Sequence, residues 1–292
     1  MSAITTSASH VSPRRRRTDQ VMRAVLLLAT LIALVPLVLV IYFLIKEGAG
    51  SWAGSFFSND PNGNFFGSPG GIRSAIIGSL LMIGLATLIA VPIGIGVALY
   101  LVEYGKQSAF ANLVRYFIDV MTGVPSIMFG LFIYIVLVIA KVGGSSYAGW
   151  KGSVAVSLLM LPVVTRSAEV VLLLVPDSLR EAALALGAPR WRVVARVVLP
   201  TAAPGLLTGS LLAVARGLGE TAPLLFTAGA TFVTTANVNQ QMNSLPLQIF
   251  TDITNPRQAV IDRAWGAALA LVALILLLNL IARTVSRRSR IA

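Results

Sequence analysis

The sequence predicts an all-α protein, a polytopic membrane helical bundle with six transmembrane helices. Of its 292 residues, 56% are hydrophobic and 12% are charged, about half the charged share of an ordinary soluble domain. Six segments are long and apolar enough for an α-helix to cross a hydrocarbon core of about 30 Å. The net charge of +12 lies mostly at the ends of these segments, a pattern that favours membrane insertion over a nucleic-acid surface.

The first predicted span follows a basic tail, residues 1–23, that we expect to be disordered and that contains four consecutive arginines, Arg14 to Arg17. Its apolar run, residues 24–45, is longer than the roughly 7–15 residues of a signal-peptide core, so we expect it to be retained. The other predicted spans are residues 74–101, 113–139, 152–174, 203–230 and 264–285.

Proline and glycine recur inside the predicted spans. Pro125 and Pro223 lie within two of them, where neighbouring helices can satisfy the carbonyl groups that proline frees. Small residues in the second span predict close helix packing, namely Gly78, Gly84, Gly94 and Gly96.

The distribution of lysine and arginine predicts that both termini are cytoplasmic. With the N-terminus inside, the inner segments hold 15 of these residues and the outer segments hold six, while Arg166 and Arg216 fall within spans; cytoplasmic loops carry the excess of such charges. The expected organisation is then a tail (1–23), a first helix (24–45), an external loop (46–73), a main membrane domain (74–286) with a cytoplasmic loop (175–200), and a tail (287–292). A second outer loop, 231–263, is polar with a possible short helix near 246–252.

The residues of most enzyme centres are missing from the sequence. It has no cysteine, its one histidine (His10) lies in the tail, and no G-x-x-x-x-G-K-[ST] loop for ATP occurs. Asp119 stands near the inner end of a span and is expected to make a helix-end contact. We therefore expect a protein that is not an enzyme and that binds no metal or cofactor.

One cytoplasmic stretch, Arg180 to Pro200, would be rejected by a bilayer. It reads R-E-A-A-L-A-L-G-A-P-R-W-R-V-V-A-R-V-V-L-P and holds four arginines. Asp177-Ser178 is an N-cap signal for a short helix, and Gly187 with Pro189 is a stop signal. The stretch is either a docking element for a cytosolic partner or an amphipathic helix lying on the membrane lipid.

The spacing within this stretch resembles a known family. Glu181-Ala182-Ala183, three residues, Gly187, nine residues and Val197-x-Leu199-Pro200 resemble the cytoplasmic motif of ABC importer permeases, with Val197 where the family usually has Ile. The resemblance implies a type I ABC importer permease fold in a bacterial cytoplasmic (inner) membrane. It also implies that five residues couple the chain to an ATPase: Glu181, Ala182, Ala183, Gly187 and Arg190.

The same resemblance implies the partners of the chain. They are a second permease subunit, two ATPase subunits that bind ATP and Mg²⁺, and an external substrate-binding protein. A second motif, Ala215 to Pro223 (A-R-G-L-G-E-T-A-P), resembles that of phosphate importer permeases and implies inorganic phosphate as the cargo. Sulfate or molybdate transport by the same kind of permease, and a stand-alone ion-coupled carrier or channel, are the alternatives.

Two charge pairs lie inside the predicted spans. Arg216 and Glu220 are four residues apart and would share a helix face, and each would cost about 2.5–3.5 kcal/mol in lipid. They form either an internal ion pair or, with Thr221, the substrate path, since arginine suits oxyanions. Arg166 and Glu169, three residues apart, are read as a structural pair or a link into the cytoplasmic loop.

Overall fold

The computed structural model describes residues 13–62 and 67–288, and every regular element within these ranges is helical, which confirms the all-α prediction. Residues Met1–Lys46 and Glu47–Ala292 form two compact units. The first unit contains most of α1 (Pro13–Gly48). The predicted disordered tail is therefore wrong from residue 13 onward, because the arginines of this segment already belong to the helix; residues 1–12 lie outside the described ranges.

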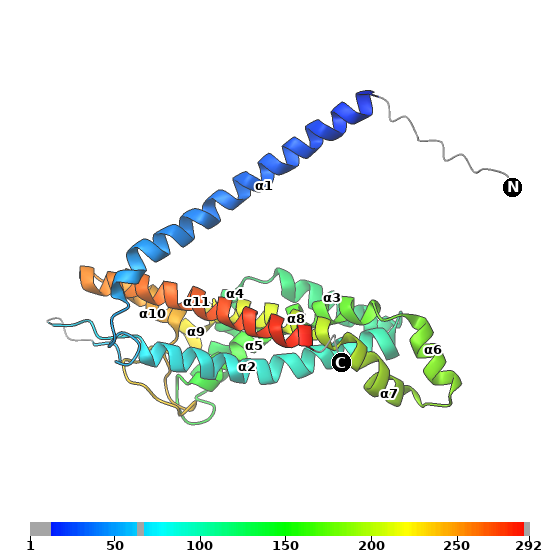
Figure 1. Cartoon of the computed structure of the whole chain (residues 1–292). Helices are drawn as coiled ribbons and strands as arrows, with labels where there is room; N and C mark the ends of the chain where they lie inside the picture. The colour runs from blue at the N-terminus through cyan, green and yellow to red at the C-terminus, as the bar shows by residue number, and fades with distance from the viewer. Residues whose placement is uncertain (1–12, 63–66, 289–292) are drawn as a thin grey trace. The chain divides into compact units, whose positions relative to one another are not determined.

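Four long helices of the second unit run side by side (Figure 1). They are α2 (Arg73–Leu99), α5 (Gly149–Leu173), α8 (Leu199–Leu218) and α11 (Gln258–Arg288). The largest buried cluster joins side chains of α2, α5 and α8, among them Ala86, Met160 and Ala213. Helix α11 closes the bundle, and of the predicted C-terminal tail residues 289–292 lie outside the described ranges.

Two glycines of α2 account for its close packing. A Cβ on Gly94 would lie 2.7 Å from Cγ1 of Val164 on α5, and a Cβ on Gly78 would lie 2.0 Å from the carbonyl oxygen of Asn243. Gly84 and Gly96 have no atom within 4 Å of such a Cβ, so the expectation that they also serve packing is wrong within this chain. Small residues matter where the backbones of two elements meet.

The predicted third span is not one straight helix. Helix α3 (Ala109–Gly123) is followed by α4 (Ser126–Ile133), which continues as η3 (Tyr134–Ile139), and the two parts are bent by 102°. Pro125 disfavours helical backbone at Val124, which is extended with ψ 130°. Within the described ranges, five helices are long and apolar enough to cross a membrane, or six if the bent pair is one span.

The predicted fifth span is also divided. Helix α7 (Arg190–Val193) and η4 (Val194–Val198) lead directly into α8, which ends at Leu218, and α9 (Ala222–Thr227) starts after a break. The two divided segments meet, because a Cβ on Gly130 of α4 would lie 2.8 Å from Cα of Pro223.

The two ends of this bundle differ in the elements they carry. Helix α6 (Asp177–Ala185) and α7 lie at one end, together with η2 (Tyr100–Gly105), the continuation of α2; α10 (Leu245–Ile253) lies at the other (Figure 1). Helix α10 matches the short helix expected near 246–252. Near it, η1 (Ala49–Ser51) packs on α11 through a hydrogen bond from Ser51 Oγ to the carbonyl of Asp262 (2.8 Å).

Two cations assigned to the outer loops are in fact buried. Lys151 is fully buried in the first turn of α5 and donates to the carbonyl oxygens of Leu137, Ser145 and Ser146 at 2.6–3.1 Å. Arg263 of α11 pairs with buried Asp252 of α10 at 2.7 Å. A buried charge is stable only with such partners. Both residues therefore anchor the fold instead of contributing to a charged outer surface.

Gly78→Ala should lower the stability of the protein by about 1–3 kcal/mol, although alanine favours a helix over glycine by about 1 kcal/mol. The reason is the backbone oxygen of Asn243, which cannot move away as a side chain would. The measurement is the melting temperature of the detergent-solubilised protein. Gly84→Ala on the same helix is the matched control and should not melt earlier than wild type; equal melting of the two variants would contradict the packing argument.

Candidate functional site

The stretch from Asp177 to Val193 forms two short helices joined by a tight turn. Helix α6 ends at Ala185, and Gly187 adopts φ +79°, a conformation that side-chain-bearing residues rarely take. The amide of Gly187 donates to the carbonyl of Leu184 (2.9 Å) and that of Ala188 donates to the carbonyl of Ala183 (3.2 Å). This is the Schellman arrangement, which satisfies carbonyl groups at a helix end and turns the chain back toward α7.

The predicted N-cap is wrong by one residue. Pro176 precedes the helix, and Asp177 is its first residue. The Asp177 carboxylate accepts a hydrogen bond from the Arg180 side chain at 3.0 Å instead of capping a backbone amide.

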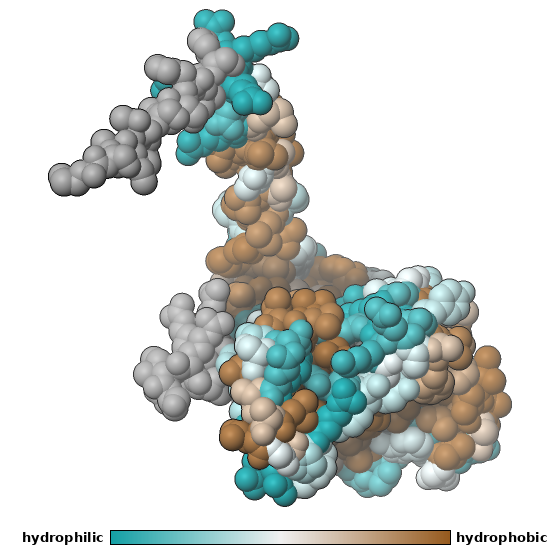
Figure 2. All heavy atoms as spheres, turned by 90° about the vertical axis from the view of Figure 1, so that its right-hand side faces the viewer, coloured by the Kyte–Doolittle hydropathy of each residue, from teal (hydrophilic) through white to brown (hydrophobic). Residues whose placement is uncertain are grey.

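Much of this stretch is exposed in the chain by itself. Glu181 and Ala182 are exposed, Ala183 is half-buried, and Arg190 is exposed. Figure 2 looks onto this end of the molecule and shows hydrophilic surface interrupted by hydrophobic patches. Large apolar side chains are exposed here as well: Leu179, Leu184, Leu186 and Trp191. Exposed apolar side chains next to charged ones mark a surface that suits contact with a protein partner or a membrane.

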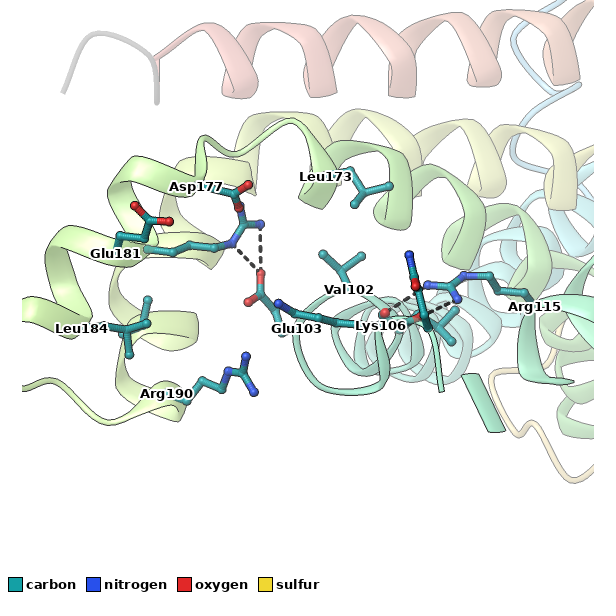
Figure 3. Close-up of a pocket in the computed structure, with 13 residues that line it drawn as sticks. Val102, Glu103, Lys106, Arg115, Leu173, Asp177, Glu181, Leu184 and Arg190 are labelled. Atoms are coloured by element: carbon teal, nitrogen blue, oxygen red, sulfur yellow. Dashed lines mark hydrogen bonds and ion pairs between the residues drawn. The ribbon is translucent and has the colours of Figure 1, made fainter. Parts of the chain in front are cut away.

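A cavity of about 690 Å³ lies behind α6, between this helix, α7, η2 and α3 (Figure 3). Its lining includes Arg180 and Glu181 of α6, Glu103 of η2, and Arg190 of α7. Arg180 differs from the other three arginines of the stretch, because its side chain is largely buried whereas Arg190, Arg192 and Arg196 are exposed. The Arg180 side chain therefore contacts the interior of the bundle, Arg190 lies at the edge of the cavity over the ring of Tyr104 (6.0 Å), and Arg192 and Arg196 are exposed.

A second set of charges lies on the other side of η2. Arg115 of α3 donates to Oε1 of Glu169 on α5 (2.7 Å), and Arg166 donates to Oε2 of the same carboxylate (2.7 Å). Arg166 also pairs with Asp119 of α3. The pair expected from the spacing of Arg166 and Glu169 thus belongs to a four-residue network that joins α3 to α5, and Asp119 makes a contact between helices.

Arg216, Glu220 and Thr221 surround the break between α8 and α9. Arg216 lies in the last turn of α8, whereas Glu220 follows the end of that helix, so the two residues do not share a helix face as expected. Among the described residues, neither side chain has an ion-pair or hydrogen-bond partner, so the internal ion pair is not formed. Arg216 is exposed and Glu220 and Thr221 are half-buried.

Tight packing on one side of α8 determines where Arg216 points. A Cβ on Gly217 would lie 2.7 Å from Ile83 of α2 and 3.0 Å from Met160 of α5. Arg216 lies instead on the exposed face, one helical turn beyond Leu212, which is also exposed. An arginine on the outward face of an apolar span is costly in lipid, so this face requires a polar cavity or another subunit.

Sequence reasoning missed two residues that line the cavity behind α6, Glu103 and Arg115. Their only signal was a charge at the inner end of an apolar span, and nothing in the spacing showed which partner each would meet. Among the residues that the structure describes, no group of three or more His, Cys, Asp or Glu could hold a metal ion.

The sequence was compared with protein families and with named relatives. Residues 90–291 match the family of binding-protein-dependent transport system inner membrane components. The chain is 40% identical over 269 residues to the phosphate transport system permease protein PstA of Pasteurella multocida, covering 92% of this chain and 94% of that one. It is 42% identical to the PstA protein of Mycobacterium leprae over 277 residues, covering 92% and 89%.

Solved structures resemble the fold at low sequence identity. A bacterial alginate ABC transporter chain superimposes with a TM-score of 0.66 at 16% identity, covering 93% of this chain and 96% of that one. A chain of the MetNI methionine ABC transporter in an inward-facing conformation gives a TM-score of 0.58 at 18% identity, covering 75% and 94%. These likenesses confirm the predicted type I ABC importer permease fold.

Glu169→Gln should destabilise the protein by about 1–3 kcal/mol, because the buried carboxylate holds two arginines from two helices. The melting temperature of the solubilised protein measures the effect. Asp119→Asn, at the exposed end of the same network (59% exposed against 7% for Glu169), is the control and should cost at most about 1 kcal/mol. A larger loss for Asp119→Asn than for Glu169→Gln would overturn this ranking.

Proposed function

Because the chain belongs to the family of binding-protein-dependent transport system inner membrane components, we propose that it is the permease subunit of an ATP-driven ABC importer for inorganic phosphate in the bacterial inner membrane. The chain is an integral membrane protein of a transport family, and its relatives of about 40% identity carry the phosphate permease name over nearly their whole length. That similarity is the observation that supports phosphate as the substrate.

The exposed turn between α6 and α7 supports the coupling to an ATPase. Small residues at Ala182 and Ala183 let a partner approach α6 closely, and Gly187 fixes the return of the chain toward α7. No ATP-binding loop occurs in the sequence, so ATP and Mg²⁺ would bind to two separate ATPase subunits. Glu181 and Arg190 are exposed at the same surface and would contribute charge to the contact.

The exposed arginine at the helix break supports an anion path between two permeases. Arg216 lies on the exposed face of the last turn of α8, and a second permease subunit would cover this face and exclude lipid from it. A guanidinium group suits the oxygen atoms of phosphate, and Glu220 and Thr221 would line the same path. Phosphate would reach this path from an external phosphate-binding protein when ATP binding moves the docked helix.

Gly187→Val should weaken retention of the ATPase subunits. A β-branched side chain disfavours positive φ by about 1–2 kcal/mol, and since the surrounding space is open the effect acts on the turn itself. Co-purification of the ATPase with the tagged permease measures it. Gly187→Asn is the matched control, because asparagine tolerates this conformation. Undiminished ATPase retention by Gly187→Val would remove the turn from the docking element.

Arg216→Gln should reduce phosphate uptake at least tenfold, the equivalent of about 1.5–3 kcal/mol for a lost charged contact. Uptake of labelled phosphate by cells lacking their own importer measures it, with co-purification of all subunits as the control for assembly. Arg216→Lys keeps the charge without the planar fork and should retain part of the activity. Wild-type uptake that sulfate or molybdate competes away would assign the permease to another anion, and normal uptake by Arg216→Gln would exclude this residue from the path.

A further inference from the structure

Arg180 is the only arginine of the docking stretch that connects α6 to the interior of the bundle. Its guanidinium contacts two other segments, η2 and the C-terminal end of α5. Nε and Nη2 both lie 3.0 Å from Oε1 of Glu103 on η2, while Nη2 and Nη1 donate to the carbonyl oxygens of Leu172 (2.9 Å) and Val175 (2.5 Å). Leu172 lies in the last turn of α5, and Val175 lies two residues after the end of that helix.

The contact with Glu103 differs in kind from the contact with Asp177. Glu103 is 7% exposed and lies on η2, whereas Asp177 is 87% exposed and lies on α6 itself, three residues before Arg180. An exposed ion pair within one helix contributes little. Glu103 is a buried carboxylate that two nitrogen atoms of Arg180 approach, so the free energy of its charged form depends strongly on that arginine. Of the two, only the Glu103 contact joins separate elements.

The inner end of α2 is held on its other side by Arg115. This side chain donates to the carbonyl oxygens of Leu101 (3.1 Å) and Lys106 (2.7 Å), and Lys106 has the unusual φ of +42°. Arg180 and Arg115 both line the 690 Å³ cavity next to η2, and Figure 3 shows Glu103 and Arg115 beside it. Space next to η2 leaves this end of α2 room to move.

We propose that Arg180 and Glu103 form the internal link that transmits displacement of the docked helix α6 to α2 and α5. A shift of α6 would pull on η2 through Glu103 and on α5 through the Leu172 and Val175 carbonyls. Helices α2 and α5 pack closely through Gly94 and Val164, so they would move together. Arg180 and Glu103 are positioning residues, because neither faces the substrate path around Arg216. This inference rests on the proposed function of the chain as an importer permease.

The test uses the complete importer reconstituted in lipid vesicles with its ATPase subunits and binding protein. Three quantities are measured for each variant: the ATPase retained, the ATP hydrolysed, and the phosphate transported per ATP. Glu103→Gln preserves the shape of the side chain and removes its charge. It should retain the ATPase and its hydrolysis but transport at least fivefold less phosphate per ATP, the lower end of the factors that link coupled sites (about 5–150-fold).

Asp177→Asn is the matched control, because it removes the exposed partner of the same arginine and should leave the transport ratio at the wild-type value. Glu103→Asp keeps the charge and should recover part of the ratio. A merely structural role would lower hydrolysis and transport in proportion, so an unchanged ratio in Glu103→Gln would overturn the proposal.

Hydrogen exchange of α6 in the same complexes is an independent measurement that requires no transport. Exchange should rise in Glu103→Gln and not in Asp177→Asn, since only the first substitution releases α6 from η2; equal exchange would contradict the link even in an inactive variant. A wild-type complex that retains no ATPase or moves no phosphate would refute the proposed function instead, so the two failures can be told apart.

Discussion

Close approach of neighbouring helices at glycine positions is the constraint on which the second unit depends. In a membrane, apolar side chains gain little by leaving lipid, so helices associate through close van der Waals packing. Gly94 lets α2 reach Val164 of α5, Gly209 lets α8 reach Ser167 of the same helix, and Gly217 brings the end of α8 against both. These contacts fix the spacing of three helices, and with it the position of every charged residue at their ends.

The same packing allows two of the membrane segments to be interrupted. Irregular backbone at membrane depth is tolerated only where protein or a water-filled cavity surrounds it. The bend at Pro125 and the break before Pro223 meet near Gly130, so each covers part of the other. Arg216 lies just before this break, on the exposed face of the last turn of α8 and outside the buried core. Such a break would destabilise an isolated helix. In this bundle it leaves Arg216, a polar residue, next to apolar helices.

Charged contacts tie the elements together at the end that carries α6 and α7. Arg180 joins α6 to η2 and α5, and Glu169 joins α5 to α3 through two arginines. Each carboxylate at the centre of these contacts is buried, so loss of an arginine would leave an unpaired charge in a poor solvent. At the opposite end, buried Lys151 and the Asp252–Arg263 pair perform a comparable structural role. Between these anchored elements, Glu181, Leu184 and Leu186 of the segment around α6 remain exposed.

The sequence by itself determined the helical class, the approximate spans, the two short helices of the stretch from Arg180 to Pro200 and the absence of an ATP-binding loop, because these depend on local composition and spacing. It also located the glycine turn at Gly187, since positive φ is a property of one residue. Tertiary structure alone decided that Arg180 faces inward to Glu103, that Arg216 and Glu220 are separated by a helix end, and that Gly78 rather than Gly84 contacts another segment. Such facts depend on which residues distant in the chain become neighbours, and a pattern of residues along one helix does not contain that information.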